Sequence, residues 1–188
     1  MDDMRLWNYI LKVTLYDKYG QHSATDEDIE KADNAIQQDM KRNGFKVPPI
    51  PADYAEFLKN TDGYEWNGMR FFGSKPFKMS EKYTLPSLLE RNVYYHQFIE
   101  KERNLLVIGQ FDDDRYVYDG DTKKYYIVDE MGFSEIDDFD SFEELLNCTL
   151  GDEYYCCIED DEELLQEYLD ETGIGETLDS LPENDGWD

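Results

Sequence analysis

Apolar residues recur with a helical period in the first part of the chain. Positions 6, 7, 10, 11 and 15 are apolar, which predicts a short amphipathic helix that ends at Gly20. A second apolar stripe occupies positions 29, 32, 36 and 40, and Gly44 after it is a natural C-terminal cap. Thr25 and Asp28 precede this stripe with the spacing of a capping box. We therefore predict two helices before the proline-rich segment 47–51.

The segment 47–51 separates these helices from a shorter set of elements. Its three prolines withhold backbone donors and favour extended geometry, so it cannot be helical. Apolar positions 54, 57 and 58 predict a short helix that ends in the turn-forming residues 60–63, and 69–72 predict a strand ended by Gly73. Thr84 and Pro86 predict the start of another helix. Its inward-facing residues are expected to be Leu85, Leu89, Val93 and either Phe98 or Ile99.

The period changes from helical to extended after residue 104. Three segments are rich in β-branched and aromatic residues: 105–109, 115–119 and 124–129. The sequence Asp-Gly-Asp at 119–121 is a good hairpin turn between the second and the third. These three segments are therefore expected to pair as an antiparallel meander. Phe133 and Ile136 predict a further short extended piece.

Helical periodicity returns near the C-terminus. Asp140 and Ser141 are expected to cap a helix that contains apolar positions 142, 145 and 146. A final amphipathic helix with an acidic outer face is predicted from apolar positions 158, 164, 165, 168 and 169. From about residue 173 we expect a tail, whose Trp187 could dock onto the folded chain.

The whole pattern predicts an α+β fold with a mostly antiparallel sheet flanked by helices, an extra N-terminal helix and an acidic C-terminal helical extension. The expected organisation is an N-terminal extension at 1–24, a domain at 25–150, and an acidic helix and tail at 151–188 packed on the same domain.

Charge is concentrated in the C-terminal two-fifths of the chain. The 188 residues carry 45 Asp and Glu against 18 Lys and Arg, a formal net charge of −27. Residues 1–111 contain 15 basic and 17 acidic side chains, whereas residues 112–188 contain 3 and 28. Because a polyanion repels nucleic acids and anionic lipid, this distribution argues against both as partners and favours a basic protein.

The remaining composition indicates a folded, cytoplasmic protein, a monomer or a weak dimer. Apolar residues make up 40% of the chain, yet no apolar run approaches the roughly 18 to 20 residues that span a bilayer. The N-terminus lacks the features of a signal peptide. Cys148, Cys156 and Cys157 have neither disulfide-framework nor zinc spacing, so we expect them to be small packing residues.

No familiar catalytic or cofactor-binding pattern occurs in the sequence. His22 and His96 have no metal-ligand spacing and are expected at the surface or its boundary. A nucleophile elbow, a P-loop and a dinucleotide fingerprint are all missing. The acidic groups 112–114 and 119–121 either hold a hard cation or are solvated turns and partner contacts, and the offsets of an EF-hand loop are not met. We therefore expect no enzymatic activity, no cofactor and no metal site.

Acidic and aromatic residues are the candidates for partner binding. Strand tyrosines 116, 118, 125 and 126 alternate in direction, so one of each adjacent pair is expected to face the core, which leaves the other free to be exposed. Tyr64 and Trp66 either pack onto their own sheet or anchor an interface. The acidic run 159–163 is either a solvated helix start or a docking face for a Lys- and Arg-rich protein. The predicted partner-binding residues are Tyr64, Trp66, Asp112, Asp113, Asp114, Tyr116, Tyr118, Asp119, Glu159, Asp160 and Asp161.

The order of motifs matches a known pattern. A helix is followed by PxxYxxFL, a turn ending in Gly, NG, a strand and FG, and later by IG, an acidic loop, YxYD, a hairpin and FxSFEELL. Over roughly residues 25–150 the chain resembles the SUKH superfamily, the Smi/Knr-type domain named after yeast regulators of cell-wall assembly, and most of all its bacterial YrhA-like branch. The matching residues are Pro51, Tyr54, Phe57, Leu58, Gly63, Asn67, Gly68, Phe72, Gly73, Ile108, Gly109, Asp112, Asp113, Asp114, Tyr118, Asp119, Phe142, Leu145 and Leu146. Two features depart from the pattern: Asp62 stands where Asn is usual, and the acidic extension after residue 150 is additional.

The resemblance implies an α+β domain without catalytic activity. Many bacterial members look like immunity proteins that bind and neutralise toxins, often nucleases, delivered between competing cells. Yeast relatives are similar to regulatory scaffolds. We therefore expect a non-catalytic immunity protein that blocks a basic toxin through an acidic and aromatic surface, with a regulatory scaffold or adaptor as the alternative.

Overall fold

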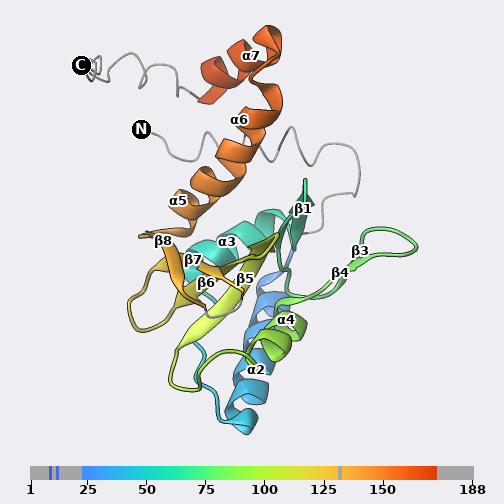
Figure 1. Ribbon diagram of the computed structural model, residues 1–188. Coiled ribbons are helices and arrows are strands. Elements are labelled where there is room, and N and C mark those ends of the chain that lie inside the picture. Colours follow the sequence, from blue (N-terminus) through green and yellow to red (C-terminus); the bar gives the residue numbers. More distant parts are fainter. Residues whose placement is uncertain (1–8, 10–11, 13–22, 131–132, 173–188) are drawn as a thin grey trace, which may run out of the picture. The chain divides into compact units, whose positions relative to one another are not determined.

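The structure is a computed structural model that describes residues 9, 12, 23–130 and 133–172 (Figure 1). The chain divides into two compact units, one formed by Asp17–Leu145 and the other by Met1–Tyr16 together with Leu146–Asp188. The predicted helix at 6–15 and the predicted tail with Trp187 lie outside the described residues, apart from Tyr9 and Lys12.

The larger unit is built on a six-stranded sheet in which all neighbouring strands are antiparallel. In spatial order the strands are β1 (Tyr64–Trp66), β2 (Met69–Phe71), β5 (Leu105–Phe111), β6 (Asp114–Asp119), β7 (Tyr125–Asp129) and β8 (Glu135–Phe139). A separate hairpin is formed by β3 (Phe77–Lys78) and β4 (Thr84–Leu85), and it projects away from the sheet in Figure 1. The predicted meander of three strands is confirmed as β5, β6 and β7.

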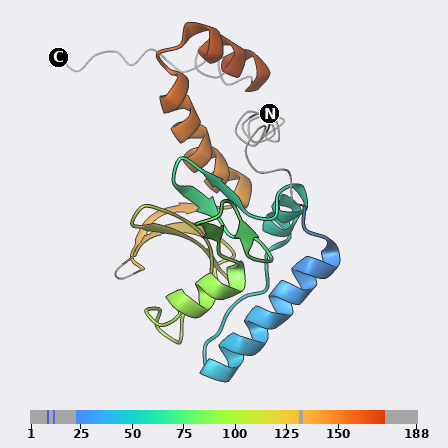
Figure 2. The same cartoon turned by 90° about the vertical axis from the view of Figure 1, so that its right-hand side faces the viewer.

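Helices flank this sheet, which confirms the predicted α+β class. They are α2 (Asp26–Asn43), α3 (Ala52–Asn60), α4 (Leu88–Tyr95) and α5 (Phe142–Leu146). Helix α2 has the predicted capping box of Thr25 and Asp28 and ends at Gly44, whose φ of 78° lies in the left-handed region. Figure 2 shows α2 alongside α4, and the two helices are in contact.

The aromatic core lies between the sheet and helices α3 and α5. The ring of Phe57 in α3 lies 5.7 Å from Phe71 in β2 and 5.1 Å from Phe142 in α5. Asp53 at the start of α3 joins these elements, since it accepts the hydroxyl of Tyr125 at 2.5 Å and the backbone N–H of Phe142 at 2.9 Å. Burial and this carboxylate raise the pKa of Tyr125 far above its ordinary value.

Helix α4 begins later than the sequence pattern predicts. Ser87, and not Thr84, forms its capping box with Glu90, and Thr84 lies in β4. Leu85 belongs to β4, and the buried face of the helix consists of Leu88, Asn92 and Tyr95. The expectation that Val93 faces inward is therefore wrong, and Val93 is 40% exposed. Of the two alternatives near the end of the helix, Ile99 is buried and Phe98 is exposed.

The smaller unit is described for Tyr9, Lys12 and residues 146–172. It contains the π-helical turn η1 (Asn147–Gly151), α6 (Asp152–Ile158) and α7 (Glu162–Thr172). The rings of Tyr9, Tyr154 and Tyr168 pack together, with centroids 5.6 to 6.0 Å apart. The single final helix predicted from the sequence is in fact two helices, because the chain turns at residues 159–161 and Asp161 caps the second one.

Candidate functional site

One end of the sheet gathers five acidic residues from two turns. Asp112 and Asp113 form the β5–β6 turn, Asp114 begins β6, Asp129 ends β7 and Glu130 follows it. Asp114 and Asp129 are direct cross-strand neighbours, and the backbone N–H of Glu130 donates to the carbonyl of Asp113 at 2.9 Å. We call these five residues the acidic end. The sheet register therefore joins two turns that lie fifteen residues or more apart in the sequence.

A buried arginine holds the acidic end in place. Arg115 is only 3% exposed and donates to the carbonyls of Asp112 and Asp114, at 2.9 and 2.7 Å. Its guanidinium also forms an ion pair with Glu130. One buried cation thus holds the backbone of the β5–β6 turn and the Glu130 carboxylate, and Asp112 and Asp113 remain exposed to solvent.

The electrostatic state of Asp114 reflects this crowding. Burial raises the pKa of its carboxyl, and the neighbouring charges of Asp113, Asp129 and Asp112 raise it further, while Arg115 opposes them. A positive group from a partner would relieve the repulsion among these carboxylates. The acidic end is therefore chemically suited to a Lys or Arg side chain.

Aromatic side chains border the acidic end. Phe111 immediately precedes it in β5 and is half-buried. Gly68 lies against this ring, since a Cβ placed on Gly68 would be 3.6 Å from it. Trp66, half-buried at the end of β1, comes just before that turn. The structure thus brings the predicted residue Trp66 to the same end of the sheet as the predicted residues Asp112, Asp113 and Asp114.

Two predicted aromatic residues are not available on the surface. Tyr64 and Tyr116 are each 2% exposed, and their rings lie 6.4 and 5.4 Å from Phe71. Both side chains belong to the core on the α3 side of the sheet, because their strand positions have the same parity as Phe71. We therefore remove both from the candidate surface.

The remaining predicted residues lie elsewhere. Tyr118 and Asp119 are half-buried at the opposite end of β6, about 17 Å along the strand from Asp114. The ring of Tyr118 lies 5.0 Å from Tyr125, and Asp119 accepts backbone N–H groups within its own hairpin turn. Glu159, Asp160 and Asp161 are exposed and belong to the smaller unit.

Sequence reasoning missed a row of polar residues across the sheet. Glu65, Arg70, Gln110 and Arg115 are successive cross-strand partners and so project from one face. On that face the Tyr95 hydroxyl of α4 donates to Gln110 at 2.9 Å, and the guanidinium of Arg115 lies 4.9 Å from the Tyr95 ring. Charged residues in strands are ordinarily predicted to face solvent. Only the alternation of Arg115 with Tyr116 could have indicated that the sheet has a second covered face, toward α4.

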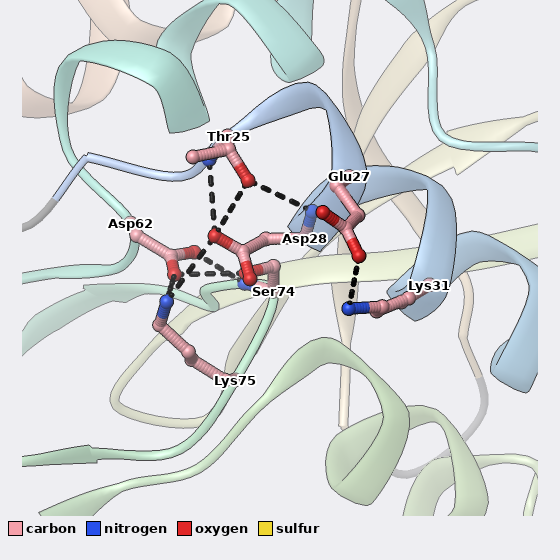
Figure 3. A network of polar contacts seen from close by, with 7 residues as sticks. All are labelled: Thr25, Glu27, Asp28, Lys31, Asp62, Ser74 and Lys75. Atoms are coloured by element: carbon pink, nitrogen blue, oxygen red, sulfur yellow. Dashed lines mark hydrogen bonds and ion pairs between the residues drawn. The ribbon is translucent and has the colours of Figure 1, made fainter.

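A buried carboxylate fixes the turn after α3 (Figure 3). Asp62 accepts the backbone N–H of Ser74 at 2.5 Å and its hydroxyl at 2.8 Å. The ammonium of Lys75 lies 3.8 Å from Asp62 and 3.3 Å from Asp28 at the start of α2. Since these partners saturate Asp62 and connect three backbone segments, its role is structural rather than chemical.

The histidine and cysteine side chains differ from the sequence predictions. His96 is 1% exposed, so its expected surface placement is wrong; its Nδ1 donates to the carbonyl of Asn92 at 2.9 Å. Burial lowers the pKa of His96, although this hydrogen bond opposes the shift. Cys148, Cys156 and Cys157 are all exposed, so the expected packing role is also wrong.

No group of three or more His, Cys, Asp or Glu side chains is placed to hold a metal ion in the described part of the chain, which comprises residues 23–130 and 133–172 with Tyr9 and Lys12. Over the same residues, no helix combines the length and the apolar character needed to cross a membrane.

Comparison of the chain with protein-family models, with curated proteins and with solved structures finds no match in any of the three.

Proposed function

We propose that this protein is a bacterial immunity protein of the SUKH type, which binds a basic toxin domain in the cytoplasm and blocks it without catalysis. The observation that carries the proposal is the acidic end, where exposed Asp112 and Asp113 stand beside Asp114, Asp129 and Glu130, at the same end of the sheet as Trp66. The order of sequence motifs supports the family. The excess of acidic residues after position 111 supports a basic protein as partner rather than a nucleic acid.

Binding at the acidic end is expected to depend on both contact and long-range attraction. Carboxylates that meet Lys or Arg side chains slow dissociation, whereas the overall negative field accelerates association. The field is screened over about 8 to 10 Å at physiological ionic strength, so the association rate should fall as salt is added.

The test is co-expression with the toxin-like protein encoded beside this one. The proposal predicts that the wild-type chain rescues growth and co-purifies with the toxin. The double variant Asp112→Asn/Asp113→Asn should bind at least about tenfold more weakly, a loss of about 1.4 kcal/mol. Glu30→Gln/Glu100→Gln is the matched control, because it removes the same charge from two exposed side chains remote from the acidic end in sequence.

Equal weakening by the two double variants would assign the effect to net charge and not to the acidic end. Absence of both rescue and complex formation would overturn the immunity function and favour the scaffold or adaptor.

A further inference from the structure

A basic region interrupts this acidic protein between residues 67 and 91. The stretch contains five Lys and Arg residues against two Glu, in a chain whose net charge is −27. It forms β2, the projecting β3–β4 hairpin and the first turn of α4 (Figure 1). Its two arginines are Arg70 in β2, which lies on the ring of Tyr83 in the hairpin, and Arg91 in α4.

Arg91 has no acidic partner within the described part of the chain. Its guanidinium lies 5.6 Å from the ring of Phe72 and 5.9 Å from the ring of Tyr95, which hold it by cation–π contacts. Its Nε is buried and has no hydrogen-bond acceptor. A half-buried arginine without an ion pair is unexpected in a protein with 45 carboxylate side chains.

Arg70 is only partly neutralised. Its Nε forms an ion pair with the Glu65 carboxylate at 3.5 Å, but the geometry is not that of a hydrogen bond. Its guanidinium lies 5.6 Å from the ring of Tyr83. The Tyr83 hydroxyl is buried and interacts with the same Glu65 carboxylate.

The electrostatic surroundings of Tyr83 include Glu65 and both arginines. Burial, the hydrogen-bonding interaction with Glu65 and the charge of that carboxylate raise the pKa of Tyr83 to about 12, and the charges of Arg70 and Arg91 both oppose this rise. Arg70 is the cross-strand partner of Gln110, which accepts the Tyr95 hydroxyl, and Arg91 lies on the Tyr95 ring. Both guanidinium groups therefore lie where α4 meets the sheet, and Glu65 supplies one negative charge against their two positive charges.

We propose that Arg70, Arg91 and Tyr83 form a binding site for one oxyanion group, a carboxylate or a phosphate. Guanidinium groups present paired N–H donors that match both oxyanions, and a tyrosine hydroxyl adds a third donor. A bound oxyanion would accept a hydrogen bond from the buried Nε of Arg91, which otherwise lacks an acceptor at a cost in free energy, and would compete with Glu65 for Arg70 and Tyr83. The site is independent of the proposed function, since a basic toxin would contact the acidic end.

The test follows the arginine Nε–H signals of the full-length ¹⁵N-labelled protein by NMR. Inorganic phosphate is titrated in one arm and acetate in the other, with sodium chloride added to hold the ionic strength constant. Loss of a signal in the variants Arg70→Gln, Arg91→Gln and Arg42→Gln assigns each arginine. Arg42, exposed in the last turn of α2, is the internal control.

Saturable shifts of the Arg70 and Arg91 signals, with little change at Arg42, are expected in at least one arm. The arm with the tighter binding identifies phosphate or carboxylate as the natural group. Arg91→Gln should weaken the affinity at least about tenfold, and Arg42→Gln should leave it unchanged. Tyr83→Phe removes only the hydroxyl and should weaken the affinity by a smaller factor, which provides a second test if Arg91→Gln unfolds the protein.

Arg70 and Arg91 signals that shift no more than Arg42, or that never saturate, would overturn the site. In that case ordered water, not an anion, satisfies the buried donors.

Discussion

The side-chain amide of Asn92 forms a pair of hydrogen bonds with the backbone of Val107. Its Nδ2 donates to the Val107 carbonyl at 2.8 Å, and its Oδ1 accepts the Val107 N–H at 2.9 Å. Strand β2 pairs with β5 only at Gly109 and Gln110, so Val107 has no strand neighbour on that side. Asn92 takes the place of that neighbour and fastens α4 to the sheet.

Replacing Asn92 with alanine should destabilise the protein by about 2 to 4 kcal/mol, because two buried backbone groups lose their partners. Urea unfolding followed by circular dichroism measures the change. Asn60→Ala is the control, since Asn60 is exposed and its amide contacts only a carbonyl of its own helix, so it should cost less than about 0.5 kcal/mol. Similar losses in the two variants would show that the bond pair contributes little.

His96 should make stability depend on pH in the mildly acidic range. Burial lowers its folded-state pKa, so the unfolded chain binds the proton more tightly. The contribution of His96 to stability is therefore complete above its unfolded pKa, near 6.5, and is lost as pH falls below that value.

Comparison of wild type with His96→Gln isolates this effect, because the acidic residues and His22 are common to both chains. The difference between their unfolding free energies should shrink as pH falls below about 6.5, by at most about 1.4 kcal/mol per pH unit. Lys101, whose ammonium lies 5.3 Å from the Phe45 ring that packs on His96, adds a positive charge nearby. A difference that stays constant with pH would contradict a neutral, buried His96.

Asp114 should be a site where charge removal stabilises the fold. It stands directly across from Asp129, and like charges in that position cost about 0.2 to 1 kcal/mol. Its folded-state pKa is raised, so its contribution to stability is present below the unfolded pKa near 3.9 and is lost as pH rises.

Asp114→Asn should therefore raise the unfolding free energy by about 0.5 kcal/mol at neutral pH and about 0.01 M salt. The gain should diminish near about 1 M salt, where the Debye length is roughly 3 Å. Glu30→Gln, on the exposed face of α2, should give a smaller gain under both conditions. An Asp114→Asn chain that is less stable than wild type would indicate that this carboxylate forms a favourable contact.

Local sequence signals were sufficient to predict an element that has its own N-cap, apolar stripe and C-terminal cap or turn. Thr25, Asp28 and Gly44 define α2 without reference to the rest of the chain, and the Asp-Gly-Asp turn sets the β6–β7 hairpin. Helix α4 differed because Thr84 and Ser87 are both acceptable caps. The choice of Ser87 coincides with the pairing of Thr84 with Lys78, a tertiary contact that periodicity does not contain.

The acidic end was only partly predictable for a similar reason. Residues 112–114 are adjacent in sequence, but their association with Asp129 depends on strand register. Alternation implied that Tyr116 and Tyr118 share one face while Arg115 occupies the other. Which face α3 covers could not be read from β6 alone, so the burial of Tyr116 and of Arg115 emerged only from the packed structure.

Gly73 should be intolerant of any side chain. A Cβ placed on it would lie 2.6 Å from the backbone oxygen of Asp62, closer than real contacts allow. Because the obstructing atom belongs to the backbone of the turn shown in Figure 3, no rotamer change can relieve the clash. Gly73→Ala should therefore cost at least about 1 to 3 kcal/mol, by overpacking.

Ser74→Ala provides the matched comparison for Gly73→Ala in urea unfolding. It removes the hydroxyl that donates to Asp62 but keeps the backbone donor of Ser74, so it should cost only about 1 kcal/mol. The smaller loss is expected because Asp62 still accepts that N–H and remains near Lys75. Equal losses of stability in Gly73→Ala and Ser74→Ala would show that the backbone of the turn can move to accommodate a Cβ. The hydrogen bonds of Asp62 would then not hold this turn rigidly.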